Sequence, residues 1–466
     1  MPSKKEVPKL VSPSANLIST DPPSGTRDFF PEDMRLRTYL FTKWRESALR
    51  FGFVEYDAPV LEHELLGLRK AGEEITEQMY NFSDKEGSKV TLRPEITPQL
   101  VRMVLSRMRL NSSTSGKIQT SELLPLKWFS VPQCWRFETT QRGRKREHFQ
   151  WNCDIIGVEG NTAELELFAV MVDFFKAVGL TAEDVGIRVN SRKILGASLK
   201  LAGVSDEDFA KVCVVVDKID KIGSAEVLKQ LIAGAGEGGL GLGLEIAQKV
   251  VKAVGSDFNL EENADLDGVE ELHKFFELAK AYNIADWLVF DPSVVRGLSY
   301  YTGIVAECFD RKGQLRAVAG FGRYDRLFTT FGAPAPVAAV GFGMGDCVLV
   351  ELLKERNLLP VLGNFVDVLV AAYPGSYAQA LGVAAKLRSQ AGVNVDMYLL
   401  EGKKIANVFK FADRVGARYM AFVAPGELEK NAVRIKDLRA GSEGKRIEKD
   451  VSLDQLAFFK DILNGE

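Results

Sequence analysis

Two apolar segments joined by a basic connection constrain the fold of this chain more than any other feature. The segments WFSVPQCWRFE (128–138) and HFQWNCDIIGVE (148–159) are rich in the aromatic and β-branched residues that favour strands. The connection between them, TTQRGRKRE, is polar and has Gly143 in its middle. The pattern predicts two antiparallel strands joined by a long, basic hairpin loop.

Composition excludes several classes of protein. With 466 residues, 46% of them hydrophobic, the chain is globular and long enough for two to four domains. It has no uncharged apolar stretch near the ~18–20 residues that cross a membrane, so no membrane partner is expected. Its five cysteines are far apart and form no CxxC pair, which argues against disulfides and a cysteine zinc site and for a reducing compartment.

Changes in composition along the chain predict five segments. Residues 1–24, rich in Pro and Ser, form a flexible arm, in which three Lys and no Arg are a poor match to a mitochondrial targeting segment. A core in two parts covers 25–194 and 286–357, and a helical insertion covers 195–285. Residues 363–466 alternate apolar strands with helices, as in a small domain that has its own parallel sheet and ends in a hairpin at 431–447.

Apolar spacing predicts the first elements of the core. A stripe through Leu36, Leu40 and Trp44 predicts a helix over 31–51, which either packs on the core or forms a dimer interface. Residues 53–62 read as one strand closed by Pro59. We further expect a hairpin over 80–92, a helix after Pro98 and a helix over 161–179.

The basic hairpin loop is the first candidate binding site. Residues 136–148 carry five basic and two acidic side chains, a net charge of +3. If Arg136 and Glu138 lie two apart on a strand, they point to one face and can grip a phosphate and an amine together. A solvated charged hairpin is the alternative, and this segment alone does not decide between them.

Three further segments carry weaker signals. In TLRPEIT (91–97), Glu95 and Thr97 suit a substrate ammonium, although a carboxylate at a helix start is also common. In VVRGLSYYTG (294–303), Arg296 needs an anionic partner, either a structural carboxylate or a ligand phosphate. The glycine-rich AGFGRYD (319–325) and GFGMG (341–345) match no phosphate-binding loop and favour close approach of a ligand or strand.

In combination and order, these segments resemble the histidyl-tRNA synthetases, a family of class II aminoacyl-tRNA synthetases, and most closely their plant-type branch. GTRDFFPED is similar to the family's opening segment, the first helix and strand to motif 1, and WRFE with its loop to motif 2. RGLSYYTG matches a signature specific to the histidine enzymes. FADRVGARYMAFVAPGE and NAVRIKDLRAG resemble the anticodon-binding domain. The resemblance implies an α+β fold, with an antiparallel sheet flanked by helices and a C-terminal α/β domain.

The resemblance also implies an activity. It implies activation of L-histidine by ATP with Mg²⁺ to histidyl-adenylate, and transfer to the 3′ end of the histidine tRNA. It further implies a homodimer, in the cytoplasm or in an organelle matrix or stroma. The resemblance implies that Arg136 and Arg296 are catalytic and bind the α-phosphate, that Arg144 binds the γ-phosphate and that Glu138 lies beside the adenine. It implies that the amino group of histidine is bound by Glu95, Thr97 and Gln150, and that its imidazole is surrounded by Asp154, Tyr300 and Tyr301. Gln141 is implied to contact the acceptor end of the tRNA.

One departure from the family pattern concerns motif 3. The family carries an arginine shortly after the motif 3 glycines, whereas this chain has Asp346, Cys347 and Val348 there. The usual clamp over adenine and the γ-phosphate therefore has no counterpart at this position. A metal site is not assigned either.

Two alternatives to an active synthetase remain. One is a regulatory subunit of ATP phosphoribosyltransferase type, which shares the fold but lacks the anticodon domain; the other is a tRNA-binding protein without activity. The overall charge of −3 argues against a nucleic-acid partner. Residues 363–466, however, carry 15 basic and 13 acidic residues, whereas 256–286 carry two and nine, so local positive patches are expected.

Overall fold

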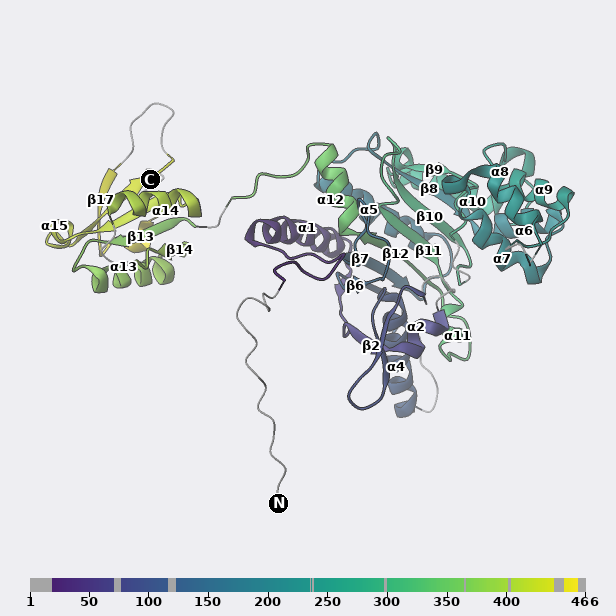
Figure 1. The fold of residues 1–466 in the computed structure, drawn as a ribbon, viewed down its shortest axis with the longest axis horizontal. Coiled ribbons are helices and arrows are strands. Elements are labelled where there is room, and N and C mark those ends of the chain that lie inside the picture. The colour runs from purple at the N-terminus through teal and green to yellow at the C-terminus, as the bar shows by residue number, and fades with distance from the viewer. Residues whose placement is uncertain are drawn as a thin grey trace, which may run out of the picture. The chain divides into compact units, whose positions relative to one another are not determined.

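The chain folds as two units, residues 1–359 and residues 360–466, each with its own sheet (Figure 1). The computed structural model describes residues 19–70, 77–115, 123–234, 236, 239–296, 300–363, 366–400, 404–439 and 448–459. Among them, no helix combines the length and the apolar character that crossing a membrane requires.

A nine-stranded sheet forms the centre of the first unit. Most neighbouring strands run antiparallel, and only the pair at each end of the sheet is parallel. The predicted fold class, an antiparallel sheet flanked by helices, is therefore confirmed. In spatial order the strands are β1 (Val54–Glu55), β5 (Leu126–Ser130), β7 (Glu147–Ile156), β12 (Ala339–Gly345), β11 (Ala319–Arg323), β10 (Ile304–Asp310), β8 (Val185–Ser191) and β9 (Leu288–Phe290), with β6 (Gln133–Trp135) paired to β7.

Alternation along these strands separates the core from the opposite face. On β7, Trp151, Cys153 and Ile155 enter the main core, so Asn152 and Asp154 between them point to the other side. Helices α1 (Pro31–Arg50), α5 (Thr162–Ala177) and α12 (Asp346–Glu355) cover the core face.

The first helix supports the sheet from its apolar side. Leu40, Trp44 and Ala48 are buried in the main core, and Trp44 stacks on Trp151 with ring centroids 6.1 Å apart. The stripe predicted from spacing therefore packs on the chain's own core, whereas the dimer-interface reading of this helix stays a prediction.

The single strand predicted over 53–62 is wrong. The chain forms β1, continues to Tyr56, whose N–H donates to Phe129 O at 2.9 Å, and then leaves the large sheet. After Pro59 it enters a second sheet as β2 (Leu61–His63), so one apolar run serves two sheets.

A small three-stranded sheet and its helices lie next to this crossing. The hairpin predicted over 80–92 is confirmed, with an Asp84 carboxylate that accepts the N–H groups of Glu86 and Ser88 in the turn. The elements here are β2, β4 (Lys89–Leu92) and β3 (Tyr80–Ser83), with α2 (Glu64–Lys70), α4 (Thr97–Ser115) and α11 (Leu327–Thr330).

Helices between β8 and β9 belong to two cores. Four of them enclose an apolar core of their own, which includes Leu199 and Val250. The last long helix instead packs on the main core, where Phe275 meets Phe168 at 5.7 Å. The helices are α6 (Arg192–Ala202), α7 (Asp206–Val216), α8 (Ile219–Ile232), α9 (Leu244–Val254) and α10 (Val269–Ala281), with short 3₁₀ turns η3 (Glu261–Asn263) and η4 (Ala285–Trp287).

The second unit is a five-stranded sheet with helices on both faces. Along the interior strand β13 (Val368–Ala372), Val368 and Val370 face one apolar core and Leu369 and Ala371 face another. The first three strands of the order β14-β13-β15-β16-β17 are parallel, as predicted; the predicted hairpin uses β16 and β17, and residues 440–447 of it lie outside the described residues. The elements are β13 (Val368–Ala372), α13 (Tyr377–Gln390), β14 (Val395–Met397), α14 (Ile405–Val415), β15 (Tyr419–Val423), α15 (Pro425–Leu428), β16 (Ala432–Asp437), β17 (Glu448–Ser452) and η5 (Leu456–Phe458).

A matched pair of leucines on α6 tests the separate helical core. Leu199 is fully buried in it, whereas Leu201 is 73% exposed. We expect Leu199→Ala to destabilise these helices by about 2–5 kcal/mol, because it leaves a cavity. Leu201→Ala should change the free energy of local unfolding by less than about 0.5 kcal/mol. Hydrogen exchange of the α6–α9 amides measures both, and equal effects would contradict this packing.

Candidate functional site

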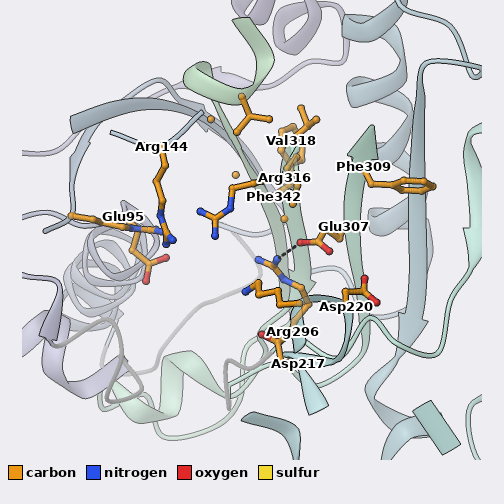
Figure 2. A pocket seen from close by; sticks show the side chains of 18 of the residues that line it. Glu95, Arg144, Asp217, Asp220, Arg296, Glu307, Phe309, Arg316, Val318 and Phe342 are labelled. Carbon is orange, nitrogen blue, oxygen red and sulfur yellow. Dashed lines mark hydrogen bonds and ion pairs between the residues drawn. The ribbon is translucent and has the colours of Figure 1, made fainter. Parts of the chain in front are cut away.

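A large cavity lies on the face of the nine-stranded sheet opposite the main core. Its volume is about 1580 Å³, more than one small molecule needs. Figure 2 shows charged side chains entering it from several elements, among them Glu95, Arg144 and Arg296. Ten of the candidate residues line it: Glu95, Thr97, Arg136, Glu138, Arg144, Gln150, Asp154, Arg296, Tyr300 and Tyr301.

Gln141 is the candidate that does not line the cavity. It is exposed at the tip of the basic loop, where its backbone exchanges hydrogen bonds of 3.2 and 2.9 Å with that of Arg144. Gly143 completes this tight turn with a φ of 70°, a left-handed conformation that favours glycine. The loop is therefore a closed turn at its tip.

Glycines of β11 and β12 form the floor of the cavity. Gly320 pairs with Gly343 and Gly322 with Gly341 across the two strands. A Cβ atom on any of the four would overlap a side chain of the site: Arg296 at Gly320, Tyr301 at Gly322, Asp154 at Gly341 and Gln150 at Gly343. The glycines were expected to permit the close approach of a ligand or strand. What approaches them here are side chains from neighbouring segments.

A buried carboxylate marks one end of the cavity. Asp154 is 2% exposed, and the hydroxyl of Tyr324 donates to its Oδ1 at 2.5 Å. Burial and the adjacent Asp154 raise the pKa of Tyr324 well above its usual value, so the hydroxyl remains a donor. Sequence reasoning missed Tyr324, although it is part of AGFGRYD and directly follows β11.

The basic loop begins differently from its prediction. β6 ends at Trp135, so Arg136 and Glu138 do not lie on a strand. Instead the N–H of Glu138 donates to Arg136 O at 2.9 Å, which makes a tight turn around Phe137. Both side chains still line the cavity. Arg136 Nε donates to Pro94 O at 3.0 Å, and the buried Glu138 pairs with Arg144.

Arg296 has an unusual backbone and a half-buried side chain that is 26% exposed. Its φ is 53°, in the left-handed region that non-glycine residues rarely adopt. Nη1 lies 3.4 Å from Glu307 Oε1, whereas the buried Nε has no acceptor among the described residues. Burial opposes the charge, but Tyr301, Glu307 and Asp217 together raise the pKa of Arg296. This Nε is therefore a donor that an oxygen of an anionic ligand can satisfy.

Glu95 and Thr97 lie where α4 begins. Thr97 is the first residue of this helix, and Glu95 lies two residues before it. Both line the cavity together with Gln150, which β7 contributes from the sheet. Tyr300 and Tyr301 lie with ring centroids 4.7 Å apart, while Gly297 to Ser299 of the same segment lie outside the described residues.

Asp346, which stands where the family carries the motif 3 arginine, has a structural role here. Asp346 is 4% exposed and accepts from the backbone N–H of Phe149 at 3.0 Å and from Arg27 Nη1 at 2.9 Å. Arg27 also pairs with Glu147 through Nε at 2.6 Å. Asp346 therefore ties the opening segment to β7 and α12 and carries no positive charge into the cavity.

His148 adds an uncharged ring to the cavity wall. Burial, with Arg136, Arg27 and Arg144 nearby, lowers the pKa of His148 from 6.5 to about 3. The imidazole is therefore neutral at physiological pH.

The lowered pKa predicts a loss of stability in acid. Because the folded-state pKa lies below the unfolded value, protons bind the unfolded chain more tightly, and stability falls as the pH drops below 6.5. At pH 5 the lowered pKa of His148 reduces the free energy of unfolding by about 2 kcal/mol. His148→Gln removes this pH-dependent loss. Urea unfolding of both proteins at pH 7.5 and 5 measures the difference. The same pH dependence in both would show that His148 is protonated in the folded state.

The described residues contain no cluster of three or more His, Cys, Asp or Glu side chains that could hold a metal ion. The carboxylates nearest the arginines are already paired, Glu138 with Arg144 and Glu307 with Arg296. These groups do not fit a resident metal centre.

Family comparisons cover both units. Residues 25–345 match the family model for histidyl-tRNA synthetase, and residues 366–458 match that for the anticodon binding domain. A histidine–tRNA ligase of Arabidopsis thaliana, named chloroplastic/mitochondrial, is 46% identical over 91% of this chain and 85% of its own length. The histidine–tRNA ligase of Opitutus terrae is 36% identical over 95% of this chain and 98% of its own length.

Solved structures agree on the fold. The histidyl-tRNA synthetase of Nostoc sp. PCC 7120 superimposes with a TM-score of 0.72 at 23% identity, covering 96% of this chain and 100% of that one. A Bacillus halodurans protein described as an ATP phosphoribosyltransferase regulatory subunit/histidyl-tRNA synthetase gives 0.68 at 20% identity, covering 88% and 99%. At such identities the likeness establishes the fold alone.

Proposed function

Because the chain belongs to the histidyl-tRNA synthetase family, we propose that its cavity activates L-histidine with ATP and passes the histidyl group to the 3′ end of the histidine tRNA. One observation carries this proposal. Three arginines, Arg136, Arg144 and Arg296, line the same cavity as the buried Asp154–Tyr324 pair. The three arginines suit a triphosphate, and the Asp154–Tyr324 pair suits a ring with N–H groups.

Adenylation needs two anions to be brought together. The histidine carboxylate attacks the α-phosphorus of ATP, the bond to the β-phosphate breaks and pyrophosphate leaves; the reaction requires alignment and cationic stabilisation of the phosphorus oxygens. We assign Arg136 and Arg296 to these oxygens, and Arg136 also to the histidine carboxylate. The orphaned Nε of Arg296 supports this role, because a phosphate oxygen gives it an acceptor.

Selection of histidine is assigned to the buried end of the cavity. Asp154 accepts an imidazole N–H, and Tyr324 holds the carboxylate in place through their 2.5 Å hydrogen bond. Tyr300 and Tyr301 close the sides of this pocket. A side chain without ring nitrogens would not supply the N–H donor that Asp154 receives from imidazole, which is a strong basis for discrimination.

The remaining candidates complete the two substrate subsites. Glu95, Thr97 and Gln150 bind the α-amino group of histidine, with the Glu95 carboxylate opposite its positive charge. Glu138 contacts the adenine, and Arg144 the γ-phosphate. Mg²⁺ enters bound to the ATP phosphates, as part of the substrate.

Recognition of tRNA is assigned to both units. Residues 363–466 form the anticodon-binding domain, and the exposed Gln141 contacts the acceptor end. The catalytic core comprises 25–194 and 286–357, with 195–285 inserted and 1–24 as an arm. The regulatory-subunit alternative is disfavoured, because this chain has the second unit and keeps the phosphate-binding arginines.

The decisive experiment is histidine-dependent ATP–pyrophosphate exchange. Wild-type protein should exchange with histidine, and Arg296→Ala should lose about 10²–10³-fold in kcat with the fold intact. Arg326→Ala, which removes an exposed arginine outside the cavity, is the matched control and should keep activity. No exchange with any amino acid would reject the enzyme. Near-normal exchange by Arg296→Ala would make this arginine structural.

We also propose a homodimer. Exposed apolar side chains concentrate in the segment from β1 to α2, where Val54 is 61%, Leu61 42% and Leu65 58% exposed. A second copy of the chain would cover them. β1 ends the nine-stranded sheet, so its outer edge is open to pairing.

Sedimentation tests the dimer. Wild-type protein should sediment at twice the mass of the 51.5 kDa chain. Leu65→Lys should shift it toward monomer, because an interface would bury an unpaired charge. Leu244→Lys, a 56% exposed leucine on α9, should leave the mass unchanged. A monomeric wild type would contradict the proposal.

Organelle localisation is a further proposal. It is supported by the name of the Arabidopsis relative, chloroplastic/mitochondrial, and is tested by microscopy of a fluorescent C-terminal fusion.

A further inference from the structure

The chain lacks an arginine at motif 3, so another group must balance the outer phosphates of ATP if the proposed function holds. After Gly345, which ends β12, come Asp346, Cys347 and Val348. Asp346 is committed to Arg27 and to the backbone of Phe149. Cys347 and Val348 line the cavity but supply no positive charge; burial raises the pKa of the Cys347 thiol.

Arg316 enters the cavity from a different element. It lies in the connection between β10 and β11, and its side chain is exposed. Figure 2 shows its guanidinium directed into the space that Arg144 enters from the other wall. Within the part of the chain that the structure describes, no carboxylate or carbonyl pairs with it, whereas Arg144 pairs with Glu138 and Arg296 with Glu307.

The backbone that carries Arg316 is fixed at both ends. The Asp310 carboxylate accepts the N–H groups of Lys312 and Gln314, both at 3.1 Å, and is itself paired with Arg356. At the other end, the N–H of Val318 donates to Cys308 O at 2.8 Å. A fixed base with an unpaired guanidinium presents a charge to a ligand with little reorganisation of the backbone.

Charge and placement indicate which part of ATP this guanidinium meets. Arg136 and Arg296 are assigned to the α-phosphate, at the reacting centre. The β- and γ-phosphates carry most of the negative charge of ATP, and Arg144 alone faces them in that assignment. A second guanidinium opposite Arg144 can bind these oxygens bidentately, which an ammonium cannot do.

We propose that Arg316 binds the outer phosphates of ATP and takes the role of the motif 3 arginine that this chain lacks. This rests on the proposed function. Other cations also line the cavity, among them Lys145 on the basic loop, Lys218 and Lys221, but a lysine ammonium is a point charge that does not bind two oxygens bidentately.

Binding and exchange measured on the full chain test the proposal. Arg316→Ala should weaken ATP binding about 10- to 100-fold by calorimetry, the effect of one lost charge-assisted contact. AMP binding should change less than about twofold, because AMP has no outer phosphates. In pyrophosphate exchange, the KM for ATP should rise by the same factor and the KM for histidine should not change. Arg316→Lys should recover part of the loss.

Lys312→Ala is the matched control. It removes one positive charge from the same connection but outside the cavity, and should leave ATP binding unchanged. Unchanged ATP affinity in Arg316→Ala, or the full loss in Lys145→Ala instead, would overturn the proposal. Equal losses for ATP and AMP would also overturn it, since the outer phosphates would then not be the contact. Absence of exchange in the wild type would instead reject the proposed function.

Discussion

The site depends on glycines at four positions where two adjacent strands, β11 and β12, face the cavity. Where β11 and β12 face the cavity, glycine pairs with glycine, and the vacated space is filled by Arg296, Tyr301, Asp154 and Gln150 from other segments. A single methyl group at any of these glycines would displace a charged or polar group that the proposed chemistry uses. Strand pairing thus fixes the floor of the cavity and the positions of its side chains together.

Local periodicity made much of the fold predictable. The helix over 31–51 and the hairpin over 80–92 follow from apolar spacing and turn residues, and both are present. The residues of β7 alternate between the core and the cavity, and Asp154 and Gln150, which the family resemblance had implied, both line the cavity. Prediction failed where the chain changes sheet after Tyr56 and where β6 ends before Arg136, because backbone hydrogen bonds to distant segments decide both.

Contacts between distant residues account for what the sequence did not reveal. Tyr324 reaches Asp154 across 170 positions, and Arg27 reaches Asp346 across 319. Neither pairing leaves a spacing that a single sequence displays. Arg316 belongs to the same group: its segment looks like an ordinary polar connection, and only the fold brings it to the cavity. The sequence did reveal the gap that Arg316 is proposed to fill, because a missing residue in a motif is a local observation.

The charge of the whole chain conceals how the cavity handles anions. The net value of −3 includes an acidic run at 256–286, while two arginines of the cavity, Arg144 and Arg296, are held by internal carboxylates. Glu138 and Glu307 keep Arg144 and Arg296 in place, at the cost of competing with a phosphate for the same guanidinium. A ligand with one phosphate gains little by replacing a carboxylate partner, whereas a triphosphate engages several guanidiniums at once. In the proposed site, internal pairing would therefore favour ATP over smaller anions. Arg316, which has no ion-pair partner among the described residues, would strengthen this preference, because it would contribute binding without first losing a partner.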